Sequence, residues 1–176
     1  FEGIVVLDEA YHDFSGKTFI KQMEKHNNLV ILRSLSKIGL AGLRVGYGIF
    51  PVMLAEQVNK VRLPYNSNSI SQWVANELLN DFTPVQNQIH SIVEERDRLM
   101  DELSKLPAIT AYPSDSNFIL FQASRDGEKV FNNLKANGTL LRNLGSHPRL
   151  KNFLRVTIGT KQENDQFLSQ LRKATS

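Results

Sequence analysis

Residues 4–11 read Ile-Val-Val-Leu-Asp-Glu-Ala-Tyr, and residues 29–37 read Leu-Val-Ile-Leu-Arg-Ser-Leu-Ser-Lys. Each stretch is a run of four apolar residues that passes directly into polar ones. Continuous apolar runs of this length are typical of strands covered on both faces, as in a parallel sheet. Residues 17–26 lie between them and predict a short helix. A strand, a helix and a second strand in this order form a βαβ unit, in which the two strands run parallel.

The sequence around this unit predicts an incomplete sheet. A third strand is expected at residues 45–50, after the Gly-rich stretch 39–42. Sheets of α/β proteins usually have about four to six strands, so partner strands are expected outside this chain. A buried strand within a few residues of Phe1 also favours a chain that begins inside a fold. We therefore expect the C-terminal part of a larger domain.

The remaining sequence predicts a second, smaller domain. Helices are expected at residues 51–62 and 70–79. A long amphipathic helix is expected at 84–106, opened by a capping box at 83–86 and ended by Pro107. Further strands are expected near 109–112, 117–121, 139–144 and 153–158, with helices at 128–136 and after the capping box at 160–163. The predicted division is a large α/β domain in residues 1–82 and a small C-terminal α+β domain in residues 83–176, linked by the long helix.

Composition excludes several classes of protein. The chain has 176 residues, 41% of them hydrophobic and 22% charged, with a net charge of +3 and no Cys. These fractions exclude a disordered, collagen-like or disulfide-scaffold protein. No apolar stretch reaches the length of a membrane span and no Lys/Arg block occurs, so neither a membrane nor a nucleic-acid partner is expected. The lack of Cys fits a reducing compartment, and we expect a cytoplasmic protein without a metal site.

The residues that carry chemistry follow the two predicted parallel strands. In open α/β sheets, ligands bind outside the carboxyl ends of the strands. Six polar side chains are expected at this edge of the sheet. They are the carboxylate of Asp8, the phenol of Tyr11, the hydroxyls of Ser34 and Ser36, the amine of Lys37 and the guanidinium of Arg44. Each of these residues alone is more often a turn former or a solvated surface residue. Their common position at strand ends is what favours a binding site.

A coenzyme with a pyridine ring, an aldehyde and a phosphate has a use for each group. Lys37 could form a Schiff base with the aldehyde. Asp8 would keep the pyridine nitrogen protonated, so that the ring can absorb carbanion charge. Tyr11 could hydrogen-bond the ring hydroxyl. The phosphate would be held by Ser34, Ser36 and Arg44, the last as a planar bidentate partner.

Five segments together resemble the histidinol-phosphate aminotransferase family of fold-type-I pyridoxal-phosphate enzymes. They are residues 6–11 (Val-Leu-Asp-Glu-Ala-Tyr), 34–37 (Ser-Leu-Ser-Lys), 42–47 (Gly-Leu-Arg-Val-Gly-Tyr), 116–118 (Ser-Asn-Phe) and 154–160 (Leu-Arg-Val-Thr-Ile-Gly-Thr). The resemblance runs from the first residue to about residue 167. It implies part of the large domain of fold type I, with its parallel-sheet βαβ unit, followed by the small C-terminal α+β domain. It corresponds to the C-terminal portion of the family's chain.

The resemblance also implies roles for individual residues. It makes Lys37 the catalytic lysine that binds pyridoxal 5'-phosphate and carries the proton, with Asp8 at the pyridine nitrogen and Tyr11 at the ring oxygen. Arg155 would bind the carboxylate of the substrate, and Asn117 lies in a segment near that pocket. The implied reaction moves an amino group from histidinol phosphate to 2-oxoglutarate in histidine biosynthesis, in a homodimer. The rest of the coenzyme cage would precede Phe1, so the isolated chain is expected to be weakly active or inactive.

Two other readings stay open. A decarboxylase of a phosphorylated amino acid such as threonine phosphate would share the same motifs. A non-catalytic fragment that only binds a partner would need none of them. Arg142 and Arg149 could attract a phosphorylated substrate, although isolated arginines are more often surface charge.

Overall fold

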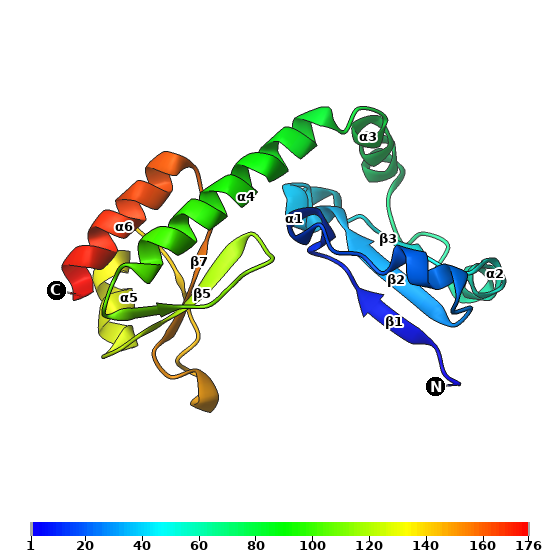
Figure 1. Ribbon diagram of the computed structural model, residues 1–176. Helices are drawn as coiled ribbons and strands as arrows, with labels where there is room; N and C mark the ends of the chain where they lie inside the picture. The colour runs from blue at the N-terminus through cyan, green and yellow to red at the C-terminus, as the bar shows by residue number, and fades with distance from the viewer. Residues whose placement is uncertain (1, 176) are drawn as a thin grey trace. The chain divides into compact units, whose positions relative to one another are not determined.

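The computed structural model describes residues 2–175 and holds two compact units, Phe1–Ile89 and His90–Ser176. The long helix α4 (Thr83–Ser104) crosses the boundary between them (Figure 1). Within the described residues, no helix combines the length and the apolar character needed to cross a lipid bilayer. The molecule is a mixed α/β protein, as expected.

Unit 1 is built around a three-stranded sheet in the order β1-β2-β3. β1 and β2 run parallel, with Val5 opposite Leu29, which confirms the predicted parallel pair. β3 runs antiparallel to β2, with Arg33 opposite Tyr47. The elements of this unit, in chain order, are β1 (Val5–Asp8), α1 (His12–Ser15), η1 (Ile20–Glu24), β2 (Leu29–Ser34), η2 (Leu35–Ile38), η3 (Ala41–Leu43), β3 (Gly46–Ile49), α2 (Val52–Val61) and α3 (Ser69–Asn80).

The crossover between the parallel strands differs from the prediction. The helix expected over residues 17–26 is wrong, because the segment contains only the short 3-10 helix η1. The backbone N–H of Phe19 donates to the Glu9 side chain at 2.7 Å, and the N–H of Ile20 donates to the Thr18 hydroxyl at 3.1 Å. These side-chain hydrogen bonds hold the start of the segment in a non-helical conformation, and a regular α-helix does not form.

The first strand is covered less than its apolar run predicts. Val5 and Leu7 are half-buried, whereas Val6 is 54% exposed. The strand therefore has one sheltered face and one open face within this unit. The core of unit 1 is formed by β2, the turn after it and helices α1, α3 and α4, with the buried side chains of Phe14, Leu29, Val30, Ile31, Leu35, Ile38, Ala75, Val85 and Ile89.

Unit 2 is an antiparallel sheet in the order β4-β5-β7-β6 with helices packed on one face (Figure 1). The side chains of β5 and β7 alternate between fully buried and half-buried, so one face carries the core and the other stays partly open. α4, α5 and α6 cover the buried face with residues such as Leu103, Leu134 and Leu171. The elements are β4 (Ile109–Ala111), β5 (Phe118–Ala123), α5 (Gly127–Ala136), β6 (Arg142–Asn143), η4 (Pro148–Leu150), β7 (Phe153–Thr157) and α6 (Lys161–Thr175).

One predicted strand of this unit is much shorter than expected. Residues 139–144 contribute only the two-residue β6. The N–H of Thr139 donates to the Leu134 carbonyl at 2.9 Å, and Gly138 has a φ of +85°. These residues complete the C-terminal end of α5, as left-handed glycines commonly do, and so they cannot extend the strand.

The two predicted capping boxes have different outcomes. At α6 the Thr160 N–H donates to Glu163 at 2.8 Å, and the Glu163 N–H donates to the Thr160 hydroxyl at 3.3 Å. These bonds confirm the box, and the hydrogen bonds from Thr160 lower the pKa of the Glu163 carboxyl. At α4 the box is wrong, because Thr83 lies inside the helix and Gln86 N–H donates to the Phe82 carbonyl.

The start of α5 packs tightly against the chain before β7 and supplies a stability prediction. The Gly127 N–H donates to the Asn152 side chain at 3.1 Å, and a Cβ on Gly127 would lie 2.6 Å from the Asn152 Cα. Gly127→Ala is therefore expected to lower the free energy of unfolding by about 1–3 kcal/mol through overpacking. Urea denaturation measures this change. Asn132→Ala, at an exposed position of the same helix, is the control and should change it by less than about 0.5 kcal/mol; equal effects of the two would contradict the packing argument.

Candidate active site

The end of β1 places a carboxylate and a phenol within one turn of chain. The Asp8 side chain accepts a hydrogen bond from the Ala10 N–H at 3.0 Å, which turns the chain away from the sheet. This turn leads directly into α1, and Tyr11 occupies the position before its first residue. Asp8 is exposed and Tyr11 half-buried, so both side chains are available at the strand end.

The end of β2 leads at once into a tight turn that carries the two serines and the lysine. The Ser34 hydroxyl caps η2 by accepting a hydrogen bond from the Ser36 N–H at 3.2 Å. Lys37 lies in η2, and Gly39 ends it with a φ of +93°. Leu35 and Ile38 are buried beneath this turn, so its apolar side chains anchor the polar ones at the surface.

The structure brings together residues from the two strand ends. The Lys37 Nζ lies 5.3 Å from the centre of the Tyr11 ring, within the range of a cation–π contact. Because β1 and β2 are parallel neighbours, their carboxyl ends meet at the same edge of the sheet. The amine, the phenol, the serines and the Asp8 carboxylate therefore all belong to one edge of unit 1.

Arg44 follows the Gly-rich stretch in an unusual backbone conformation. It ends η3 with a φ of +57°, in the left-handed region that non-glycine residues seldom adopt. Its side chain is exposed and donates to the Ala41 carbonyl at 3.4 Å. The structure thus holds the guanidinium against its own loop, and this is the side-chain hydrogen bond of Arg44 within residues 2–175.

The donor set at this edge fits pyridoxal phosphate. An amine can bind the aldehyde, a carboxylate can pair with the ring nitrogen, and a phenol can donate to the ring oxygen. The hydroxyls of Ser34 and Ser36 at the start of η2 suit a phosphate, because each can donate a hydrogen bond to a phosphate oxygen. The Lys37–Tyr11 contact shows that the groups from the two strand ends reach one another.

Arg155 lies on the partly open face of the sheet of unit 2. Its guanidinium carbon stacks 4.7 Å from the centre of the Phe118 ring. The Nε atom is buried and, among residues 2–175, has no hydrogen-bond partner. A guanidinium that lies over an aromatic ring and keeps an unsatisfied donor suits a planar anion such as a carboxylate.

Asn117 lies beside the strand that carries this arginine. Its carbonyl accepts a hydrogen bond from the Ile158 N–H at 2.9 Å, which ties the start of β5 to the end of β7. The preceding Ser116 is buried, and its hydroxyl donates to the Phe118 carbonyl at 3.2 Å. This short loop fixes the Phe118 ring beneath Arg155.

Arg142 is a second arginine at this place, and the sequence predicts for it either attraction of a phosphorylated substrate or an ordinary surface charge. It stands directly opposite Arg155 in the β6–β7 pair, so both side chains project from the same face of the sheet. The sequence alone does not show this pairing, because the register between β6 and β7 depends on the loop of residues 144–152 that joins them. The structure therefore adds a neighbouring cation to the expected carboxylate site.

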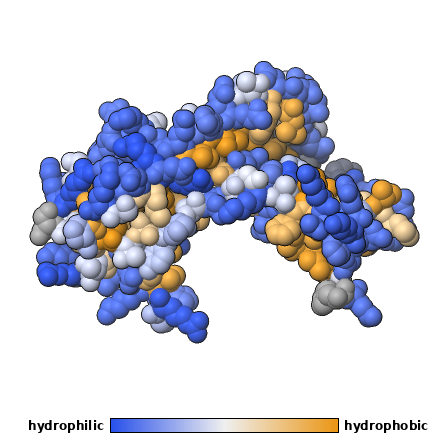
Figure 2. Space-filling model, viewed as in Figure 1, coloured by the Kyte–Doolittle hydropathy of each residue, from blue (hydrophilic) through white to orange (hydrophobic). Residues whose placement is uncertain are grey.

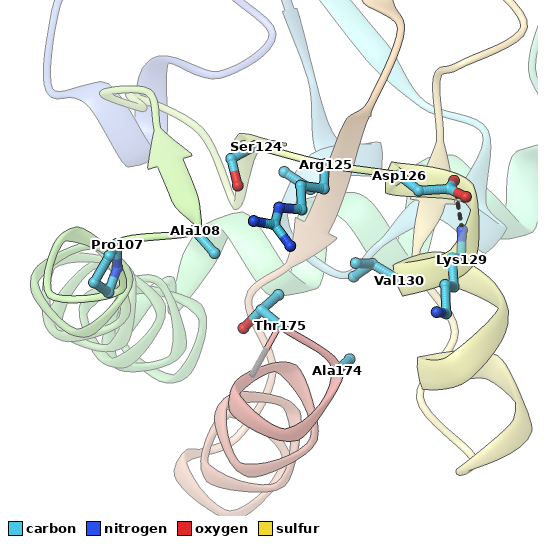
Figure 3. Close-up of a pocket in the computed structure, with 10 residues that line it drawn as sticks. Pro107, Ala108, Ser124, Arg125, Asp126, Lys129, Val130, Ala174 and Thr175 are labelled. Atoms are coloured by element: carbon cyan, nitrogen blue, oxygen red, sulfur yellow. Dashed lines mark hydrogen bonds between the residues drawn. The ribbon is translucent and has the colours of Figure 1, made fainter.

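A cavity of about 600 Å³ lies elsewhere in unit 2 and contains none of the predicted site residues. Figure 3 shows it between the start of β4, the loop before α5 and the end of α6, with the Asp126–Lys129 hydrogen bond at its margin. Its cations, Arg125 and Lys129, are both exposed. Cavity size therefore does not identify the chemistry of this protein.

Comparison with known proteins extends the geometric result. The sequence profile of the family aminotransferase class I and II matches residues 1–171. A curated histidinol-phosphate aminotransferase from Vesicomyosocius okutanii is 42% identical over 172 residues, which are 98% of this chain and 48% of that protein. The chain thus spans about half the length of the curated relatives it matches.

Solved structures agree on the fold. The histidinol-phosphate aminotransferase from Clostridium acetobutylicum superposes with a TM-score of 0.87 at 26% identity, over 98% of this chain and 54% of that one. The enzyme from Sinorhizobium meliloti, solved in complex with pyridoxal-5'-phosphate, has a TM-score of 0.81 at 23% identity, over 98% of this chain and 48% of that one. The profile match over nearly the whole chain shows that this chain belongs to the aminotransferase class I and II family.

Proposed function

We propose that this chain carries the coenzyme lysine and the substrate arginine of a pyridoxal-phosphate-dependent histidinol-phosphate aminotransferase. The observation that carries the proposal is the contact of Lys37 with Tyr11 at the edge of the sheet where Asp8 also lies. Family membership and the name of the 42% identical relative support the choice of reaction and substrate. The amino acceptor is 2-oxoglutarate.

Each residue at the edge of unit 1 has one task in this reaction. Pyridoxal phosphate, when bound, supplies an aldehyde and a ring that accepts the electron pair left by a broken Cα–H bond. Lys37 would bind the aldehyde carbon through its amine until the amine of the substrate replaced it there, and the freed lysine amine would then move the proton from Cα. Asp8 holds a proton on the ring nitrogen, and Tyr11 donates to the ring oxygen. Ser34, Ser36 and Arg44 bind the phosphate, for which Arg44 exchanges its bond to Ala41.

The residues of unit 2 serve the substrate. Arg155 binds a carboxylate through two parallel N–H groups, one of them the buried Nε that has no partner within residues 2–175. Arg142, directly opposite, adds positive charge for the second anionic group of 2-oxoglutarate or for the phosphate of histidinol phosphate. Asn117 supports the pocket from the start of β5.

The proposal includes a homodimer and a cytoplasmic location. Unit 1 exposes large apolar side chains on α2 and α3 (Figure 2), and Trp73 on α3 is 65% exposed. Such side chains suit an interface between subunits. The lack of Cys suits a reducing compartment.

The experiment that tests this function uses the full-length gene product and three readouts. Pyridoxal phosphate should give a visible absorbance band that lysine modification removes. With histidinol phosphate and 2-oxoglutarate the protein should form glutamate. Release of carbon dioxide from threonine phosphate without glutamate formation would support the decarboxylase instead, and no coenzyme band at all would support the non-catalytic fragment.

A further inference from the structure

A network of three side chains, Glu9, Thr18 and Arg33, lies directly beside the proposed coenzyme residues. The Glu9 carboxylate accepts hydrogen bonds from Arg33 Nη2 at 3.0 Å and Nε at 3.2 Å, from the Thr18 hydroxyl at 2.9 Å, and from the Phe19 N–H at 2.7 Å. Arg33 Nη2 also donates to the Thr18 hydroxyl at 2.9 Å. The network therefore links three separate parts of the chain: the end of β1, the end of β2 and the crossover between them.

The charged pair of this network is well shielded from water. The Glu9 side chain is 7% exposed and the Arg33 side chain 14%. Burial by itself raises the pKa of the Glu9 carboxyl, but the hydrogen bonds from Phe19, Thr18 and Arg33 outweigh it and hold that pKa below its ordinary value. A shielded ion pair adds little net stability compared with apolar residues of the same size, because removing both charges from water is costly. Its defined geometry is the property that an apolar pair would lack.

The sequence positions of Glu9 and Arg33 indicate which part of the site the ion pair holds in place. Glu9 follows Asp8 directly, and Arg33 precedes Ser34 directly. The Glu9 N–H also donates to the Leu32 carbonyl at 2.8 Å and continues the β1–β2 ladder one residue past Asp8. The spacing between the Asp8 side and the Ser34–Lys37 side of the site is therefore fixed at this point.

We propose that Glu9 and Arg33 are positioning residues that set the distance between the ring-binding and the phosphate- and aldehyde-binding halves of the coenzyme site. This inference rests on the proposed function. One coenzyme must reach Asp8 at its ring nitrogen and Lys37 at its aldehyde at the same time. A displacement of about 1 Å between reacting groups can cost about 100-fold in rate, so a rigid link between the two strand ends has a direct use.

The test compares Glu9→Gln with Glu95→Gln in the full-length gene product. Glu95 pairs with Arg98 at 2.8 Å, with side chains 18% and 31% exposed, in unit 2. It is a matched control because it also loses a partly buried ion pair. Both variants should unfold more easily than the parent. Only Glu9→Gln should raise the dissociation constant for pyridoxal phosphate, by about 10- to 100-fold, and shift the coenzyme absorbance maximum.

A readout without coenzyme separates this inference from the proposed function. The rate at which an amine-reactive reagent labels Lys37 in the coenzyme-free protein, measured by peptide mass spectrometry, should change severalfold in Glu9→Gln. The rate at the exposed Lys21 should stay the same. If the parent shows no coenzyme band, the proposed function fails while the labelling still tests the positioning role.

Two results would overturn the inference. One is a Glu9→Gln variant that unfolds more easily but keeps the parent's dissociation constant, absorbance maximum and Lys37 labelling rate. If Glu9→Gln does not fold, Arg33→Lys replaces it, since lysine keeps the positive charge but loses the Nε–H and Nη2–H pair that holds the Glu9 carboxylate. The other overturning result is a folded Arg33→Lys variant whose Lys37 labelling and coenzyme binding match those of the parent.

Discussion

Lys37→Ala is expected to abolish both the visible coenzyme band and amino transfer in the full-length gene product. In the proposed site the lysine amine binds the coenzyme aldehyde, and no other amine lies among the candidate residues at this edge of the sheet. Loss of the proton transfer alone lowers kcat by about 10²–10⁴-fold. Absorbance between 300 and 500 nm and a glutamate-formation assay measure the two losses.

Two controls make this result specific. Lys21→Ala removes an exposed lysine from η1 of the same unit and should leave both readouts unchanged. Methylamine added to Lys37→Ala should restore a small part of the rate, because a free amine can take over the missing proton transfer. An unchanged visible spectrum in Lys37→Ala would contradict the role of this lysine.

Arg155→Lys is expected to raise KM for 2-oxoglutarate strongly while leaving the coenzyme band in place. Lysine keeps the charge but loses the planar pair of N–H groups and the stacking on the Phe118 ring. Loss of one partner from a desolvated charge pair costs about 2–5 kcal/mol, which corresponds to about 30-fold or more in apparent affinity. Initial rates at varied 2-oxoglutarate, with saturating amino donor, measure the change.

Substitutions of two other arginines of unit 2 serve as comparisons for the effect of Arg155→Lys on KM. Arg142→Gln should also raise KM, but by less, because Arg142 is exposed and lies opposite the binding residue. Arg149→Gln, at the exposed helix η4, should leave KM unchanged. A parent-like KM in Arg155→Lys, or an equal rise in Arg149→Gln, would contradict the assignment of the carboxylate site.

Much of the fold could be predicted from local patterns. The apolar runs that end in polar residues identify β1 and β2, and the pairing of Val5 with Leu29 confirms their parallel direction. The failures occur where side chains from distant residues decide the outcome. Residues 17–26 have a helical pattern, but the Glu9 side chain holds the Phe19 N–H, ten residues along the chain, and the segment forms only the 3-10 helix η1. Such a contact over ten residues leaves no local sequence signal.

The candidate site could likewise be predicted only in part from the sequence. The residue types at the strand ends, and the motifs they form, indicate the chemistry, and the Lys37–Tyr11 contact joins two of them. The sequence does not indicate the Glu9–Arg33 pair or the position of Arg142 opposite Arg155, because both depend on strand register. The role of Arg44 also stays a prediction, since its guanidinium contacts its own loop.

The two arginines that face each other on β6 and β7 lower the stability of the folded protein. Like charges directly across an antiparallel pair are destabilising, by about 0.2–1 kcal/mol, and within residues 2–175 neither arginine forms an ion pair. Selection for thermal stability alone would favour a neutral residue at one of the two positions. An anion that binds between them relieves this repulsion, so part of its binding free energy comes from strain that the folded sheet already stores.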